Sequence, residues 1–95
     1  MNNYTIKVTR LKRVFGFAIP FKLVIDEKEI GSLPNGKKYD CNVSKGTHKV
    51  ILKSTEKDVI EEVTLDEHKE VELQVVAKMG LVAARPFIKE IIYRD

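Results

Sequence analysis

Cys41 and His48 are the pair in this sequence whose residue types suit nucleophilic chemistry. A thiolate nucleophile needs a base that takes its proton and a third group that orients the base, a role open to Asp26 or Asp40. Cys41, however, shares one face of the predicted strand 39–43 with apolar neighbours, where a free cysteine is typically part of the core. No glycine-rich turn or helix start lies beside it to activate a thiol or hold an oxyanion. We therefore expect a buried thiol and no catalytic residue.

The remaining ligand-forming residues are too scattered for a metal or cofactor site. Cys41, His48 and His68 follow one another at separations of 7 and 20 residues, whereas zinc ligands come in close pairs. The stretch GSLPNG, residues 31–36, lacks the closing Lys and Ser/Thr of a phosphate-binding loop. The acids of EKDVIEE and DEHKEVE alternate with apolar residues as on a solvated sheet face, with no opposed carboxylate pair. We expect no metal, no cofactor and no small-molecule substrate.

A basic stripe is the first surface feature that could bind a partner. Lys7, Arg10, Lys12 and Arg13 lie within seven residues of one another. Such a stripe can contact phosphates, and Tyr39 could stack on a base, as in single-strand binders built on β-barrels. The alternative, which we favour, is a solvated strand face that is neutralised by acidic strands of the second half.

The second surface feature is aromatic. Phe15, Phe17, Ile19 and Phe21 recur at even spacing in VFGFAIPF, and most of them must be core in a protein of this size. Any exposed part would mark a partner or self-association surface. The candidate interaction surface therefore comprises Lys7, Arg10, Lys12, Arg13, Phe15 and Phe17.

The net charge of +3 hides a division along the chain. Residues 1–53 carry 11 Lys/Arg against 4 Asp/Glu, and residues 54–95 carry 6 against 10, so the halves are +7 and −4. Two interpretations remain open: a basic face for an acidic partner, or two halves that neutralise each other once their strands pair.

The elements that would position these residues are strands, because apolar and polar residues alternate with period two along most of the chain. A short strand is predicted at 29–33, and longer ones with apolar faces formed by Tyr4, Ile6 and Val8; Phe21, Leu23 and Ile25; Tyr39, Cys41 and Val43; His48, Val50 and Leu52; Val59, Val63 and Leu65; and Val71, Leu73 and Val75.

Turn residues separate these strands. Glu27 and Lys28 reverse the chain, Asn35 with Gly36 forms a tight turn, and Gly46 permits the next. The last segment contains Pro86, which excludes a central strand. We favour an edge strand there over a short helix that starts near Pro86.

Composition agrees with one soluble domain over residues 1–95. The chain is 43% hydrophobic and 33% charged, with a single Cys that excludes an internal disulfide. Because the first residues do not form a secretory signal and no apolar stretch reaches about 20 residues, we expect a cytoplasmic protein without a membrane span. Some seven short strands predict an all-β fold, an antiparallel β-sandwich such as the Ig-like type.

The stretch from residue 20 to 76 resembles the PEGA-like and related small bacterial β-sandwich domains. The shared positions are Val24, Ile25, Asp26, Ile30, Gly31, Gly46, His48 and Val50; where their pattern has Gly after the Asp, this chain has Glu27. The resemblance implies a small sandwich used as an accessory or surface module, with no known catalytic activity.

These observations together predict a non-catalytic interaction module whose partner is another protein or a second copy of the chain. Binding of nucleic acid or another polyanion through the basic half is the alternative. A sugar-binding module is a third interpretation, weakened because the chain has no Trp to stack on sugar rings.

Overall fold

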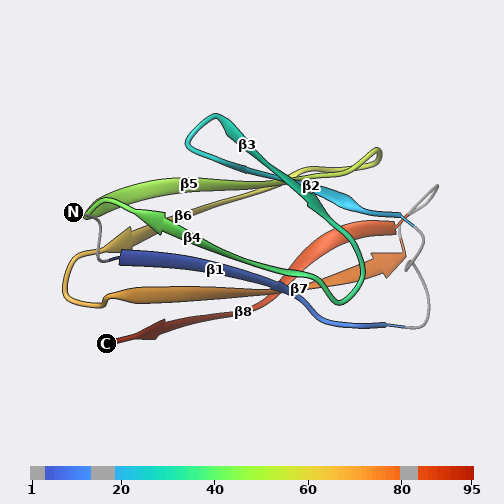
Figure 1. The fold of residues 1–95 in the computed structure, drawn as a ribbon. Helices are drawn as coiled ribbons and strands as arrows, with labels where there is room; N and C mark the ends of the chain where they lie inside the picture. Colours follow the sequence, from blue (N-terminus) through green and yellow to red (C-terminus); the bar gives the residue numbers. More distant parts are fainter. Residues whose placement is uncertain (1–3, 14–18, 80–83) are drawn as a thin grey trace.

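The computed structural model describes residues 4–13, 19–79 and 84–95. Within them the chain forms eight strands and no helix, which confirms the predicted all-β class. The strands are β1 (Tyr4–Arg10), β2 (Phe21–Ile25), β3 (Lys28–Leu33), β4 (Lys38–Val43), β5 (Gly46–Lys53), β6 (Val59–Leu65), β7 (Glu70–Met79) and β8 (Ala84–Arg94). They make two four-stranded sheets, β4-β1-β7-β8 and β3-β2-β5-β6, which lie in two layers (Figure 1).

One strand pairing departs from the predicted antiparallel arrangement. β1 runs parallel to β7, from Thr5 opposite Glu70 to Arg10 opposite Val75, and every other neighbouring pair is antiparallel. A parallel pair requires a long crossover, and here the whole of the second sheet lies between the two strands in sequence. Alternation within a strand reports which face is buried but not which neighbour it takes.

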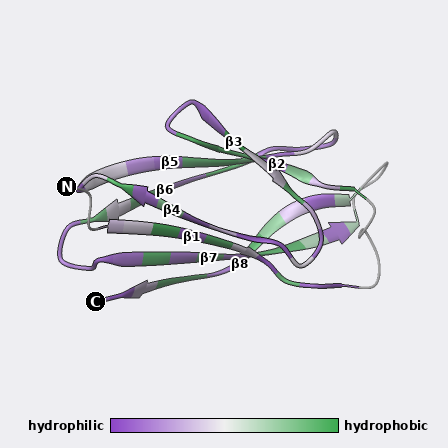
Figure 2. Cartoon of the chain, in the orientation of Figure 1, coloured by the Kyte–Doolittle hydropathy of each residue, from purple (hydrophilic) through white to green (hydrophobic). Residues whose placement is uncertain are grey.

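The core lies between the two sheets and consists of the apolar strand faces predicted from alternation. Figure 2 shows this alternation as changes of colour along the strands, with hydrophilic residues in the β2–β3 and β6–β7 turns. Burying one such side chain contributes about 1.5–3 kcal/mol. The fully buried members are Ile6, Val8, Leu23, Leu33, Leu52, Leu65, Val71, Leu73 and Val75.

The β2–β3 hairpin turns one residue earlier than predicted. Ile25 pairs with Lys28, so Asp26 and Glu27 form the two-residue loop, with φ angles of 51° and 67°. Positive φ at both positions is the type I′ geometry that matches strand twist, and it favours Asn, Asp or Gly. Asp26 suits this turn, whereas Glu27 occupies it at a steric cost.

The last segment is an edge strand, as we favoured from Pro86. Pro86 lies opposite Ala77 in β7, at the outer edge of its sheet, where its missing N–H costs no ladder bond. A bulge follows, because Val75 pairs with Ile88 while Gln74 pairs with Glu90. The extra residue resets which side chains face the core.

Candidate functional site

Lys7, the first of the predicted interaction residues, is neutralised on the outer face of its sheet. It lies in register between Asp40 of β4 and Glu72 of β7. Arg94 bridges Glu72 and Glu70 at 2.7 and 2.8 Å, and together with Lys7 it lowers the pKa of the Glu72 carboxyl. The neutralised strand face that we favoured is therefore present along the middle of β1.

Arg10 does not belong to an interaction surface, because its residue is only 1% exposed. Its Nη1 donates hydrogen bonds to the carbonyls of Ile19 and Leu33 at 2.9 and 2.8 Å. The guanidinium also stacks 4.1 Å from the centre of the Phe21 ring. Burial lowers the pKa of Arg10, which nevertheless stays far above neutral. Arg10 has the same inward parity as Ile6 and Val8, so its assignment to the interaction surface from its charge is wrong.

Lys12 and Arg13 are exposed and lie beside the β3–β4 turn. The Asn35 side chain accepts a hydrogen bond from the Arg13 amide and donates one to the Arg13 carbonyl, both at 2.9 Å. Gly36 completes the turn with a φ of 80°, so Asn35 contributes its side chain rather than a positive φ. Phe15 and Phe17 lie outside the described residues.

Positive charge is concentrated at one end of the sandwich, which draws its residues from both halves of the sequence. One end, at the right of Figure 1, gathers the β3–β4 and β5–β6 turns, the end of β7 and the start of β8. It comprises residues 10–13, 19–22, 33–39, 52–59, 76–79 and 84–87, which we call the cationic end.

The cationic end holds ten Lys/Arg and two Asp/Glu, a net charge of +8. All other residues hold seven against twelve, a net charge of −5, and together the two sets give the chain's +3. The stretches 1–3, 14–18 and 80–83 contain no charged residue, so this division covers every charge. Positive charge is therefore concentrated at one end of the sandwich, and the rest of the chain is net negative.

A groove of about 300 Å³ opens at the cationic end. The Lys78 ammonium lies 3.8 Å from the centre of the Phe87 ring, and Phe87 remains 44% exposed. Met79, next to Lys78, is 62% exposed. Three cations and three apolar residues line the groove, and no acid does: Lys57, Val59, Lys78, Arg85, Pro86 and Phe87.

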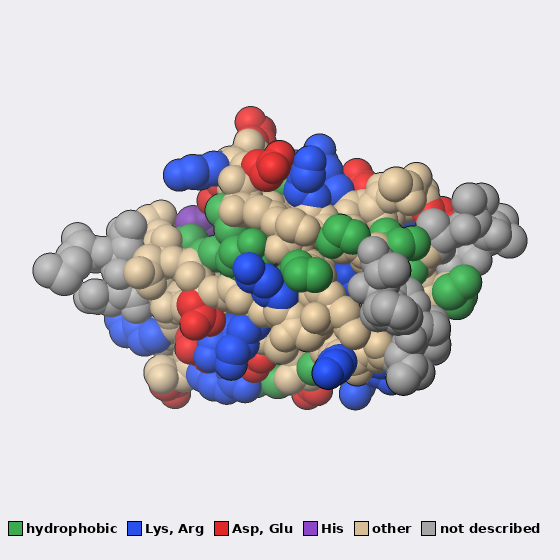
Figure 3. Space-filling model, turned by 45° about the vertical axis from the view of Figure 1, so that its right-hand side comes forward, with side chains coloured by type: hydrophobic (Ala, Val, Ile, Leu, Met, Phe, Trp, Pro, Cys, Tyr) green, Lys and Arg blue, Asp and Glu red, His purple; other side chains and the backbone are tan. Residues whose placement is uncertain are grey.

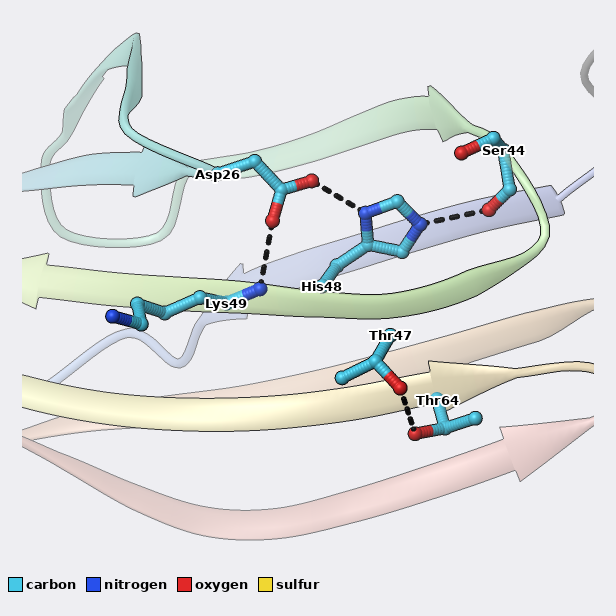
Figure 4. Close-up of polar contacts among 6 residues, drawn as sticks. All are labelled: Asp26, Ser44, Thr47, His48, Lys49 and Thr64. Atoms are coloured by element: carbon cyan, nitrogen blue, oxygen red, sulfur yellow. Dashed lines mark hydrogen bonds and ion pairs between the residues drawn. The ribbon is translucent and has the colours of Figure 1, made fainter.

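His48 is held by hydrogen bonds at both ring nitrogens (Figure 4). Nδ1 lies 2.5 Å from the Asp26 carboxylate and Nε2 lies 2.7 Å from the Ser44 carbonyl oxygen. Because both partners are acceptors, both nitrogens must donate, which requires the imidazolium form. Burial alone lowers the pKa of His48, but the bonds to Asp26 and Ser44 outweigh it and the pKa is raised.

The Asp26 carboxylate is shared between the hairpin turn and β5. Its second oxygen accepts the Lys49 amide at 2.9 Å, and the Asp26 amide donates to the Lys49 carbonyl at 2.9 Å. Desolvation raises the pKa of Asp26, yet the bonds from His48 and the Lys49 amide prevail and lower it. The pair therefore fastens the β2–β3 turn to β5 and to the loop between β4 and β5.

Cys41 is half-buried rather than fully buried, in a groove of about 260 Å³ between the edges of the two sheets. Figure 3 shows hydrophobic side chains along the seam between the sheets, with charged ones above and below. Burial and the neighbouring Asp40 raise the pKa of the Cys41 thiol, which keeps it protonated and weakly nucleophilic. His48 has no free lone pair to take its proton, so the geometry does not form a nucleophile and base.

No metal-binding cluster of three His, Cys, Asp or Glu side chains occurs among the described residues. Within the same residues, no helix has the length and hydrophobicity to span a membrane.

Comparison with protein families, with curated proteins and with solved structures finds no match for this chain.

Sequence reasoning missed Lys57, Lys78, Arg85 and Phe87, because they are isolated in sequence and the conformation of residues 77–95 was left open. Lys78 and Arg85 become neighbours only when β7 and β8 pair as a hairpin. Residues 75–79 and 84–90 show no clear apolar–polar alternation, so no local signal in the sequence pairs these two stretches as a hairpin.

Proposed function

We propose that this chain is a non-catalytic interaction module that binds acidic side chains of a partner protein at its cationic end. The observation that carries the proposal is the net charge of +8 at that end, against −5 over the rest of the chain. Such a field attracts and orients an acidic partner before contact, which raises the association rate.

The groove at the cationic end supplies apolar contact surface, which exposed charges alone do not provide. A solvent-exposed ion pair contributes about 0.2–1 kcal/mol, so a few lysines do not make a stable complex. Val59, Pro86 and Phe87 add apolar surface within reach of Lys57 and Lys78. Interfaces commonly combine an apolar, aromatic centre with charges around it, and the groove has this composition.

Binding of nucleic acid or another polyanion is the second candidate, favoured by the same excess of cations. One feature counts against it. Tyr39, the residue expected to stack on a base, packs against the core, donates its hydroxyl hydrogen bond to the Ser32 carbonyl and lies under the Lys37 ammonium. Its ring face is therefore already occupied.

Charge-reversal variants with matched controls test the proposal. The groove variant replaces Lys57, Lys78 and Arg85 by Glu, and the control replaces Lys28, Lys49 and Lys89, which lie outside the cationic end. Both change the net charge by the same amount. The probes are poly-L-glutamate and single-stranded oligothymidylate of equal charge, each measured at several salt concentrations.

We expect poly-L-glutamate to bind the parent and the control variant and to lose at least tenfold in affinity for the groove variant. Equal losses in both variants, or no binding to the parent, would overturn the proposal. Tighter binding of oligothymidylate than of poly-L-glutamate at every salt concentration would favour the second candidate instead.

A further inference from the structure

Four strands form the edges of the two sheets, and they differ in how they are protected against a further strand. β8 has Pro86 and a bulge, both of which interrupt pairing. β3 contains a bulge at Ile30, and the Tyr39 hydroxyl already occupies its Ser32 carbonyl. β4 carries charges at Lys38 and Asp40.

β6 has none of these devices at its first two residues, Val59 and Ile60. The described strand has no proline or bulge, and Ile60 is 59% exposed on its outer face. Ile60 continues an apolar row across the sheet, opposite Ile51, which in turn lies opposite Val24. The acids Glu61 and Glu62 follow at its third and fourth residues, in the middle of the strand.

The backbone of β6 also directs amide and carbonyl groups toward the free edge of the strand. The Lys49 amide donates to the Asp26 carboxylate on the side of β5 away from β6 (Figure 4), and the Lys49 carbonyl accepts the Asp26 amide on that side. Lys49 and Glu62 are therefore a pair without backbone hydrogen bonds, which turns the Glu62 amide and carbonyl to the free edge. By the two-residue period, Ile60 and Thr64 point the same way.

A contact at the other end of β6 agrees with this register. The Thr64 amide donates to the Tyr93 hydroxyl of β8, at 3.4 Å, and thus faces away from β5. The side chains of Thr64 and Thr47 meet at 2.9 Å, as expected for a pair without backbone hydrogen bonds, whose side chains lie closer together. The amide and carbonyl groups of Ile60 and Glu62 thus face the free edge, where an added strand would form hydrogen bonds with them.

We propose that an extended segment of a partner protein binds by adding a strand to the free edge of β6. This inference rests on the proposed function and names its binding mode. A residue opposite Val59 would direct its side chain into the groove lined by Lys57, Lys78 and Arg85, so we expect an acid there. The residue opposite Ile60 would lie on the outer face and should be apolar.

Glu61 and Glu62 of β6 determine which residue type is favoured at the third position of the partner segment. A residue opposite Glu61 or Glu62 should be basic, because like charges directly opposite destabilise a strand pair. A segment that runs parallel to β6 would therefore have an acidic, an apolar and a basic residue in succession, and a segment that runs antiparallel would have them in the reverse order. Backbone pairing supplies affinity, and these three side chains supply specificity.

Synthetic peptides separate strand addition from simple charge attraction. The probes are two blocked heptapeptides, Thr-Val-Asp-Val-Lys-Val-Thr for parallel addition and Thr-Val-Lys-Val-Asp-Val-Thr for antiparallel addition, and each is made also in two forms that are N-methylated at alternate residues. One alternate set of amides would face β6 and the other would face solvent. We expect one methylated form to lose at least tenfold in affinity and the other to bind as the parent peptide does.

The protein is tested in the same way with Ile60→Pro, which removes only an amide directed at the free edge and leaves pairing with β5. Ile60→Ala keeps the amide and serves as the control. Far-UV circular dichroism and a urea titration establish that both variants fold. We expect Ile60→Pro to lose at least tenfold in affinity and Ile60→Ala to lose less.

Equal binding of the two methylated peptides, or unchanged binding by folded Ile60→Pro, would overturn strand addition while leaving the proposed function in place. If the parent protein does not bind poly-L-glutamate, the proposed function itself is overturned. If sedimentation shows that the chain dimerises and that Ile60→Pro abolishes this, the occupant of β6 is a second copy and the proposal of a partner segment fails.

Discussion

Replacing Asp26 by Asn tests the interpretation of the buried histidine. In the parent protein both nitrogens of His48 donate, which holds the ring as an imidazolium. Asn has the same shape but presents an amide group that donates to Nδ1, while Nε2 continues to donate to the Ser44 carbonyl. The neutral imidazole can then form both hydrogen bonds, one accepted at Nδ1 and one donated from Nε2. In the variant the His48 ring stays buried but no carboxylate stabilises its charged form. The pKa of His48 should therefore fall below its ordinary value.

The expected destabilisation follows from the bonds that change. A hydrogen bond to a charged group contributes about 1.5–3 kcal/mol when buried. The Asp26 side chain is 48% exposed, so solvent screens the interaction, and the Asn oxygen can still accept the Lys49 amide. We therefore expect a loss of about 1–2 kcal/mol in the free energy of unfolding.

This loss should depend on pH with a definite sign. The pKa of His48 is raised on folding, so its stabilisation is complete below the unfolded value of about 6.5 and disappears as pH rises through the native value. The pKa of Asp26 is lowered, so its contribution is complete above about 3.9 and disappears at more acidic pH. The variant should lose most between about pH 4 and 6.5 and less at pH 9.

Urea unfolding of both proteins at pH 5.5 and pH 9, with an NMR titration of the His48 ring, measures these quantities. An equal destabilisation at both pH values, together with an unchanged pKa for His48, would refute the assignment of a charged pair.

Further substitutions test other parts of the fold. Glu27→Gly should raise the free energy of unfolding by about 1 kcal/mol, measured in urea, because it relieves a side chain at a φ of 67°. Gly31→Ala should cost about 1–3 kcal/mol, since its Cβ would lie 2.5 Å from the Tyr39 Oη, and less in a Tyr39→Phe background; equal costs would exclude that clash. Arg10→Met should cost about 3 kcal/mol in the same assay, as two carbonyls lose their donor; a neutral effect would contradict this role. Native Cys41 should react with iodoacetamide several times more slowly than the urea-unfolded chain, and equal rates would show an accessible thiolate.

Much of the fold could be predicted because alternation is a local property. Every predicted inward face was right, including that of β7, where Val71, Leu73 and Val75 are all fully buried. Pro86 correctly favoured an edge strand. The local rules also misplaced one turn by a residue at Glu27, because a charged side chain in a position suited to Gly gives no clear sign of positive φ.

The candidate site was less predictable, since its residues come together only through pairing between distant strands. Lys7 and Arg10 are three residues apart on the same strand, yet one is neutralised at the surface and the other is buried under Phe21. Their charge in the sequence is the same. The neighbours that decide their roles come from β7 and from the start of β2.

The sequence by itself determined that this protein is a layered β structure, because the period of its apolar residues fixes which side of each strand is buried. The tertiary structure decided where the charge lies. The parallel pairing of β1 with β7 sets Lys7 beside Glu72, while the hairpin of β7 and β8 brings Lys78 next to Arg85. Electrostatic interactions act through space between whichever strands are neighbours, and strand order is not written in the alternation of any single strand.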